Sequence, residues 1–347
     1  MGLFFELLQV ALGTREKLSL VPDVREWKLL YEEAGRQTIV GVLFGGLEQL
    51  PEEQLPPVQL KLQWIGMVKK IEVGYRLHVK RSGELAVEVK DAGFESSVLK
   101  GVAMARYYPK PERRQCGDID LWISGCRKDV MKWLRSRYET GHCVWHNVGV
   151  EFFKDVPVEV HFHPGWLYQP WHNRRLQRWF DGYASSITSA ATCDGQLEYN
   201  VMPVEFDVVY SLVHSYRHLI AGGIGLRHVV DYFYVLKTAR LKGLQIDTIN
   251  NDFKRFGLLK FASAMMWVQQ KVCGMPREEL LCEPDEKEGR FLLNEIRRGG
   301  NFGHYSQERS ERGKMAQLIA MLPHYPGEVL WVLPWKCWHL GWRVLNR

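Results

Sequence analysis

The chain has 347 residues and a formal net charge of +6, and 46% of its residues are hydrophobic while 25% are charged. This composition is typical of a soluble globular protein with one large domain or two to three smaller ones. No apolar run approaches the ~20 residues that a transmembrane helix needs. The mild basic excess lacks the density that is typical of tight nucleic-acid binders, whereas it suits anionic small substrates.

The seven cysteines are scattered, odd in number and without a CxxC pair. The apolar residues 3–8 include Glu6 and follow no basic segment, so they predict an amphipathic helix rather than a signal peptide. We therefore expect a cytoplasmic protein with reduced thiols and no zinc site built from cysteine. The cysteines are Cys116, Cys126, Cys143, Cys193, Cys273, Cys282 and Cys337.

Residues 1–92 predict an N-terminal helical region. Asp23 precedes an apolar-periodic segment, which is typical of a helix start. Residues 58–89 form a long amphipathic pattern with helical spacing. Gly66 and Gly74 lie inside this pattern and weaken the expectation of one unbroken helix.

The pattern changes after this region. Residues 94–99 are short and strand-like, and they end at Lys100 and Gly101. Residues 102–108 then predict one or two helical turns, which Pro109 ends. This strand–glycine–helix unit stands directly before the most informative segment of the chain.

That segment, residues 116–123, holds two aspartates inside an apolar run. Because a strand alternates its side chains, Asp118 and Asp120 are expected on one face and the apolar residues on the other. Two carboxylates on one face repel each other unless a cation neutralises them. Mg²⁺ prefers oxygen ligands and often bridges to substrate phosphates. The segment therefore predicts a Mg²⁺ or Mn²⁺ site that acts on a nucleotide.

Residues 147–153 and 156–163 predict a hairpin whose second arm carries a third carboxylate. Glu159, His161 and His163 share one face of that arm. We interpret His161 either as a residue near the site or as a hydrogen-bonded structural histidine. For His163 we favour the structural role.

From about residue 170 onward the chain predicts helices. Residues 205–219 and 225–237 show strong apolar periodicity. His214 and His218 stand four residues apart on the first of these helices, a spacing that can bind a metal ion. Because no HExxH glutamate accompanies them, we favour packing in the core or in the wall of the site.

The predicted fold is α+β, with an N-terminal helical region (1–92), a core with a small mixed sheet (93–165) and a larger C-terminal helical domain (166–347). The end of the chain combines tryptophan with basic residues, which suits either a membrane interface or packing on the helical domain. We favour packing. These residues are Trp331, Trp335, Lys336, Trp338, Trp342, Arg343 and Arg347.

Three motifs resemble the polymerase-β-like nucleotidyltransferase superfamily. They are Leu99-Lys100-Gly101, Arg114-Gln115-Cys116-Gly117-Asp118-Ile119-Asp120 and Glu159-Val160-His161. They resemble most closely the LKG, RxxGDID and EVH signatures of an uncharacterised bacterial nucleotidyltransferase family. Residues 222–227 and Asp231 are also similar to that family's helical region, so the resemblance extends to about residue 240. Lys100-Gly101 replaces the superfamily's usual Gly-Ser.

The resemblance implies an enzyme that moves a nucleoside monophosphate from an NTP, such as ATP, to an unidentified acceptor hydroxyl or phosphate. It implies that Asp118 and Asp120 hold Mg²⁺ or Mn²⁺. Glu159 would be the third metal ligand or the base that accepts a proton from the acceptor. The nucleotide-binding residues that it implies are Lys100, Gly101, Arg114 and Gly117.

Several alternatives stay open at this point. A non-catalytic nucleotide-binding or antitoxin-like module would keep the fold without turnover, although three carboxylates favour an enzyme. Arg227 and Asp231 stand four residues apart, and an intrahelical ion pair explains them. We interpret Arg113 as a solvated neighbour of the site. The acceptor, the preferred base and the oligomeric state stay open.

Overall fold

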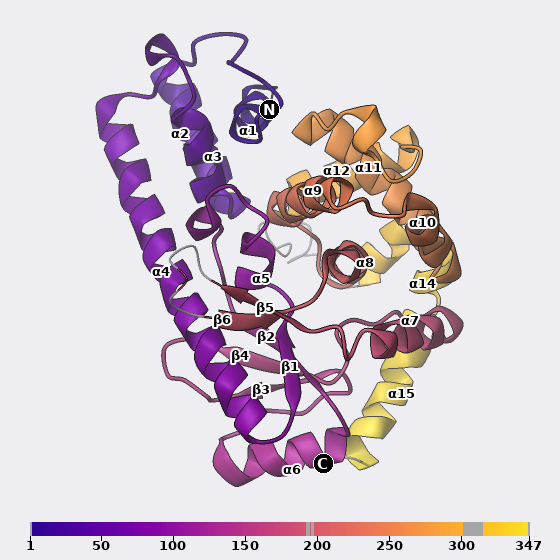
Figure 1. Ribbon diagram of the computed structural model, residues 1–347. Helices are drawn as coiled ribbons and strands as arrows, with labels where there is room; N and C mark the ends of the chain where they lie inside the picture. Colours follow the sequence, from indigo (N-terminus) through magenta and orange to yellow (C-terminus); the bar gives the residue numbers. More distant parts are fainter. Residues whose placement is uncertain (1, 192–194, 196–197, 301–314, 346–347) are drawn as a thin grey trace.

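The computed structural model describes residues 2–191, 195, 198–300 and 315–345, so Cys193 and Arg347 lie outside the described part of the chain. A group of N-terminal helices stands on one side of a small sheet, and a group of C-terminal helices stands on the other (Figure 1). The predicted α+β fold with a small mixed sheet and a helical C-terminal region is confirmed.

The N-terminal group begins with a short apolar helix and ends with a very long one. Helix α2 starts with a capping box, because the Asp23 side chain accepts from the Glu26 backbone while the Glu26 side chain accepts from the Asp23 backbone. The long helix α4 has 34 residues and passes through Gly66 and Gly74 without a break. Packing against α3, β1 and β6 stabilises it beyond its local propensity. The helices are α1 (Gly2–Ala11), α2 (Val24–Arg36), α3 (Val40–Leu47), η1 (Glu52–Gln54) and α4 (Val58–Asp91).

The central sheet has four strands in the order β1-β2-β4-β3. Strand β2 pairs antiparallel with β1 and parallel with β4, while β3 and β4 form the antiparallel hairpin that the sequence predicts. The strands are β1 (Glu95–Val98), β2 (Ile119–Ser124), β3 (Asn147–Val150) and β4 (Val158–His161); between them lie α5 (Val102–Ala105), η2 (Pro111–Arg113) and α6 (Arg127–Arg137).

A second hairpin corrects the prediction that the chain is helical throughout from residue 170. Strands β5 (Thr188–Ala191) and β6 (Glu198–Val201) pair antiparallel. Strand β6 buries Tyr199 and Val201 against β1 and α4, whereas β5 is mostly exposed. Two strands of four residues with one exposed partner carry too little apolar alternation to be distinguished from a loop in the sequence.

The C-terminal helices enclose an apolar core. Helices α8 and α9 pack against each other and are buried along most of their length, which explains their strong apolar periodicity. The helices are α7 (Pro170–Gly182), α8 (Val204–Ala221), α9 (Leu226–Leu241), α10 (Ile246–Arg255), α11 (Leu259–Cys273), η3 (Arg277–Glu279), α12 (Glu286–Gly299), α14 (Pro326–Val329) and α15 (Val332–Leu345). Buried apolar side chains from all three predicted regions form one hydrophobic cluster. The predicted domain boundaries at residues 92 and 165 therefore stay a prediction.

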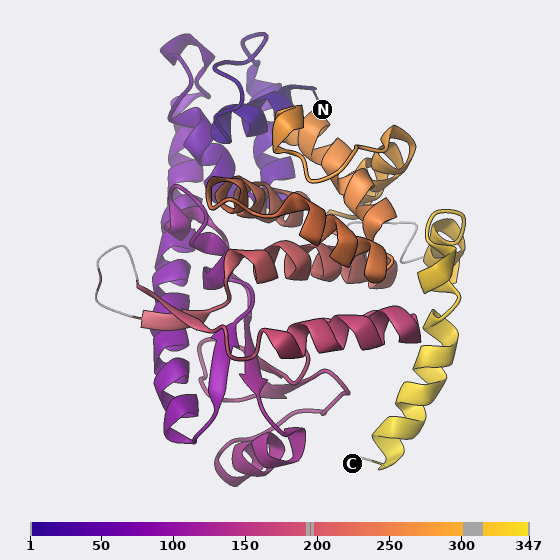
Figure 2. The same ribbon diagram turned by 45° about the vertical axis from the view of Figure 1, so that its right-hand side comes forward.

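The tryptophan-rich end of the chain packs partly on the rest of the molecule. Helix α15 runs along the outside of the protein from α14 toward the C-terminus (Figure 2). Trp335 stacks on Trp166 with ring centroids 4.0 Å apart, whereas Trp338 is 49% exposed. Within the described ranges, no helix combines the length and the apolar character that crossing a membrane requires. Contact with a membrane surface stays a prediction.

Candidate active site

Two parallel strands bring the predicted carboxylates together. In the register between β2 and β4, Asp120 lies opposite Glu159 and Trp122 lies opposite His161. Asp118 directly precedes β2, whose first residue is Ile119. Neighbouring strands are about 4.8 Å apart, so side chains on the same face of such a pair can share one site.

Asp120 is the most buried of these carboxylates, with 1% of its surface exposed. Its Oδ1 lies 2.8 Å from Nε2 of His161, and its Oδ2 lies 2.8 Å from Nζ of Lys100. Burial by itself raises the pKa of Asp120, but the charge of Lys100 and the hydrogen bond from His161 outweigh it and hold the pKa well below its ordinary value. Asp120 is therefore an anion with a cation on each oxygen.

His161 links two of the carboxylates. Burial lowers the pKa of His161, but hydrogen bonds to Asp120 and Glu159 raise it more. The pKa of His161 is therefore about 9. The distance from His161 Nε2 to Glu159 Oε2 is 3.7 Å. Asn147 on β3 donates to the same Glu159 oxygen at 2.5 Å. Hydrogen bonding to His161 lowers the pKa of Glu159, which stays ionised at the half-exposed edge of the site.

Asp118 behaves in the opposite way to Asp120. The negative charge of Asp120 raises the pKa of Asp118, and burial adds to this shift. Such repulsion between carboxylates is what a bound divalent cation relieves. The donor set also fits a hard metal ion, because Asp118, Asp120 and Glu159 supply carboxylate oxygens. One ligand atom each from Asp120, Glu159 and His161 lies within 4.8 Å of the others.

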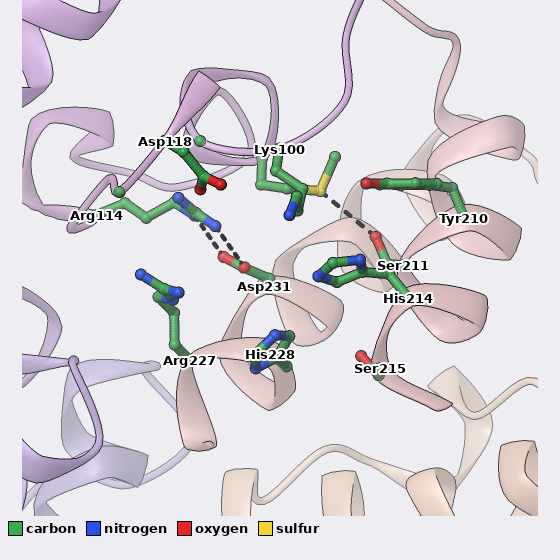
Figure 3. A pocket seen from close by; sticks show the side chains of 13 residues that line it. Lys100, Arg114, Asp118, Tyr210, Ser211, His214, Ser215, Arg227, His228 and Asp231 are labelled. Atoms are coloured by element: carbon green, nitrogen blue, oxygen red, sulfur yellow. Dashed lines mark hydrogen bonds and ion pairs between the residues drawn. The ribbon is translucent and has the colours of Figure 1, made fainter. Parts of the chain in front are cut away.

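A cavity adjoins this group, between the turn at Lys100 and helices α8 and α9 (Figure 3). The space inside it that a water-sized sphere can occupy is about 40 Å³, well below the ~300–1,000 Å³ usual for small-molecule sites, while the empty space including the open mouth is about 520 Å³. Five of the predicted site residues line it, namely Lys100, Gly101, Arg114, Gly117 and Asp118. Gly101 is the N-cap residue that directly precedes α5, and its φ of +59° is a conformation that favours glycine.

Arg114 is buried and already holds a carboxylate. Its Nε and Nη2 each donate to Asp231 at 2.7 Å (Figure 3). The hydroxyl of Tyr108 donates to the same aspartate. Asp231 therefore pairs with Arg114, which comes from a different element. The expected intrahelical pair between Arg227 and Asp231 is not the main contact of this aspartate. The Nη1 of Arg227 donates instead to the carbonyl of Gln115 at 3.2 Å. Contact of Arg114 with a phosphate stays a prediction.

Arg113 is not the solvated neighbour that the sequence suggests. Its side chain is only 12% exposed, and its Nη2 donates to Glu48 Oε1 at 2.8 Å. Its guanidinium also lies over the ring of Phe44 at 5.1 Å. Arg113 therefore binds the N-terminal helices to the core through Glu48 on the one side and Glu72 of α4 on the other.

The structure adds residues that the sequence argument missed. Tyr210 and His228 line the cavity beside the expected His214, and Asn147 fixes Glu159. Burial raises the pKa of Tyr210 well above its ordinary value. His228 stands directly after Arg227 in a segment that the sequence argument had singled out. Its approach to His214 and His218 depends on how α8 and α9 pack, which no local pattern indicates.

The histidines of this wall differ from His161. Burial holds the pKa of His214, His218 and His228 well below the ordinary value.

His163 stacks on Trp145 with ring centroids 4.2 Å apart, and burial lowers its pKa to about 4. These contacts fit the structural role expected for His163.

A small mixed sheet with carboxylates on two adjacent parallel strands is the arrangement that the resemblance to nucleotidyltransferases implies. The model of the family described as "uncharacterised nucleotidyltransferase" matches residues 23–274, and the chain belongs to this family. The structure is also similar to the crystal structure of an antigenic nucleotidyltransferase-like protein from Paracoccidioides brasiliensis. That likeness has 14% identity and a TM-score of 0.32, covers 52% of this chain and 91% of the other, and is too distant to carry an argument. The comparison with curated proteins found no match.

Proposed function

We propose that this protein transfers a nucleoside monophosphate from an NTP, such as ATP, to an acceptor hydroxyl or phosphate. The proposal rests on one observation above all: the β2–β4 register places Asp120 opposite Glu159, next to a cavity that Asp118 and Lys100 line. Membership of a nucleotidyltransferase family supports the reaction class. The proposed setting is the cytoplasm.

Asp118, Asp120 and Glu159 are the residues that would hold Mg²⁺ or Mn²⁺. When bound, the ion would polarise the α-phosphate and neutralise the leaving pyrophosphate. His161 acts as a positioning residue, because its Nε2 holds Oδ1 of Asp120 and lies near Glu159. Glu159 lies at the open edge, where its carboxylate can accept the proton of an acceptor hydroxyl.

The triphosphate would enter beside Lys100 and Gly101. The Lys100 ammonium lies at the border between the carboxylates and the cavity, so it can contact a phosphate oxygen there. Gly101 has no side chain to keep a phosphate away from its backbone. Gly117 lines the same cavity and is exposed, which leaves its backbone accessible to the nucleotide.

Isothermal calorimetry with Mg²⁺ and an NTP tests the proposal. We expect the double variant Asp118→Asn/Asp120→Asn to lose Mg-NTP affinity by on the order of a hundredfold or more. Because Asp120 is buried between two cations, the single variant Asp118→Asn and circular dichroism separate lost binding from lost folding. Asp129→Asn, an exposed aspartate on α6, is the matched control. Unchanged Mg-NTP affinity in folded Asp118→Asn and in the double variant would contradict the proposal.

A non-catalytic, antitoxin-like module is the rival function. Such a module has no need for a complete set of three carboxylates. Incubation of the protein with labelled NTPs and a cell extract separates the two functions. Transfer of label that depends on Asp118 supports the enzyme, whereas NTP binding without any transfer supports the module.

A further inference from the structure

Three histidines lie close together on the α8–α9 side of the cavity, and two of them, His214 and His228, line it. His214 and His218 lie one turn apart on α8, so they share a face of that helix. His228 comes from the first turn of α9. One ring nitrogen from each lies within 4.8 Å of the other two. The sequence indicated only the pair on α8, and the third histidine makes a triangle of ligand atoms.

The arrangement of the rings suits shared coordination of one ion. Their centroids are 4.3 Å (His214–His218), 5.6 Å (His214–His228) and 5.4 Å (His218–His228) apart. Zinc–nitrogen bonds of 2.0–2.1 Å in a tetrahedral site place ligand nitrogens about 3.4 Å apart. The spacing here is therefore within about 1.5 Å of that geometry, a difference that side-chain rotation can supply.

One of these rings carries a polar atom with no partner. Nε2 of His214 is buried, and among the described residues it has no hydrogen-bond partner. His214 and His228 both line the cavity, next to Tyr210, Ser211 and Ser215 (Figure 3). The buried hydroxyl of Tyr210 likewise has no partner within the described part of the chain. Buried polar groups are rarely left in this state unless a ligand, ion or water satisfies them.

We propose that His214, His218 and His228 bind a transition-metal ion, with Zn²⁺ as the first candidate, and that the fourth coordination position faces the cavity. Neutral imidazole is the commonest protein ligand for such ions, and three histidines with one open position are a known form of zinc site. The site is distinct from the proposed Mg²⁺ site, because carboxylates select hard ions and imidazoles select zinc, copper or nickel. It goes beyond the proposed nucleotidyl transfer.

The surrounding charges decide what the fourth ligand is. Three basic residues, Lys100, Arg114 and Arg227, line the same cavity with two acidic ones, Asp118 and Asp231, so basic residues outnumber acidic ones there. This basic excess opposes a bare dication by Coulomb repulsion, and it favours an anion bound to the dication. The fourth ligand is therefore hydroxide or an oxygen of an anionic substrate group, such as a phosphate.

Titration with Co²⁺ tests this site without nucleotide. The full chain is stripped with a chelator, dialysed and titrated with Co²⁺ while visible absorption is recorded. We expect one Co²⁺ per chain, with the strong absorption of four-coordinate cobalt, and its loss when Zn²⁺ is added. His214→Gln and His228→Gln each lower the Co²⁺ affinity by on the order of a hundredfold or more.

Two controls define the result. His142→Gln changes an exposed histidine outside the cavity lining and leaves the Co²⁺ titration as in the unmodified protein. Asp118→Asn leaves the cobalt absorption intact while it removes Mg-NTP affinity, so failure of one site is distinguished from failure of the other.

The proposal is overturned if the unmodified protein binds no stoichiometric Co²⁺ or Zn²⁺. It is equally overturned if folded His214→Gln and His228→Gln titrate like His142→Gln. Circular dichroism of each variant without metal establishes that it is folded. Because two separate histidines are replaced, misfolding of one variant still leaves a decisive comparison.

Discussion

Two walls of the candidate site, the sheet that carries His161 and the helices α8 and α9, treat histidine in opposite ways. On the sheet, His161 is buried against Asp120 and Glu159, and its pKa rises to about 9. On the helices, His214, His218 and His228 are buried against one another, and their pKa values fall well below the ordinary value. Burial disfavours the charged form in both cases, so the neighbours decide the outcome. One wall is a network of paired ions, and the other is a cluster of neutral rings.

The largest expected effect comes from breaking the ion pair that ties the two walls together. Arg114 precedes β2 and Asp231 lies on α9, and both side chains are almost fully buried. Arg114→Met leaves the carboxylate of Asp231 buried without its cation, which should lower the free energy of unfolding by about 3–5 kcal/mol. Urea denaturation measures this loss.

The control for this prediction is the less buried pair between Glu48 and Arg113, whose side chains are 35% and 12% exposed. Glu48→Gln removes the partner of Arg113, and we expect a loss of only about 0–1 kcal/mol. The double variant Arg114→Met/Asp231→Leu should recover much of the stability, because no unpaired charge remains. If Arg114→Met costs no more than Glu48→Gln, the buried pair does not hold the walls together.

A smaller effect, with opposite signs on the two walls, is expected from Lys100→Met. Lys100 neutralises Asp120 and lowers the pKa of each of the three histidines by its charge. Its removal should weaken Mg-NTP binding by about tenfold, because a charged hydrogen bond contributes about 1.5–3 kcal/mol. The same change should strengthen Co²⁺ binding at the histidines.

Calorimetry with Mg-NTP and absorption with Co²⁺ measure the two affinities of the Lys100→Met variant. Lys110→Met, which removes an exposed lysine paired with Glu48, is the control and should leave both affinities unchanged. A fall in both affinities would mean that Lys100 supports the cavity as a whole and does not separate two sites.

The smallest expected effect is on how the free energy of unfolding depends on pH. It has an alkaline limb, set by His161, and an acid limb, set by the histidines of α8 and α9. The folded-state pKa of His161 is about 9 and its ordinary value is 6.5. Its contribution to stability is therefore fully present below pH 6.5 and is lost as the pH rises through 9. For the helix-wall histidines the folded-state pKa is lowered, so the unfolded state binds more protons below pH 6.5 and stability falls on acidification.

Urea denaturation of the metal-free protein between pH 5 and about pH 10 checks both limbs. His161→Gln should flatten the alkaline limb, and His214→Gln should flatten the acid limb. Asp120 and Glu159 contact His161, and the pKa of each carboxylate is lowered, so both stay ionised between pH 6.5 and 9. Equal effects of the two variants on both limbs would remove the distinction between the walls.

Much of the fold follows from local pattern. The long amphipathic stretch predicts α4, and the alternating apolar segments predict β1, β2 and the β3–β4 hairpin, because burial of one face imposes its period on the sequence. The β5–β6 hairpin escaped prediction, since its strands are short and one is mostly exposed. The two glycines in α4 were a poor guide, because tertiary packing outweighs a local propensity cost of about 1 kcal/mol each.

The residues of the candidate site likewise fall into those that local sequence pattern indicates and those that depend on remote contacts. Asp118, Asp120 and Glu159 were identified because carboxylates in apolar strands are locally conspicuous. The partner of Arg114 was not identified from the sequence, because Asp231 lies 117 residues away along the chain. Arg113 was misjudged for the same reason, because Glu48 reaches it from the N-terminal helices.

By itself, the sequence predicted the segments of the four-stranded sheet and put Asp120 and Glu159 on two of its strands, with Asp118 directly before one of them, because alternation along a strand is a local property. Only the tertiary structure decided which cation holds each carboxylate, which histidine is charged and that His228 joins His214 and His218. These properties depend on distances between side chains that are remote in the chain, and strand register and helix packing set those distances. Electrostatic energies in a buried site vary steeply with such distances, so protonation and metal binding are tertiary properties.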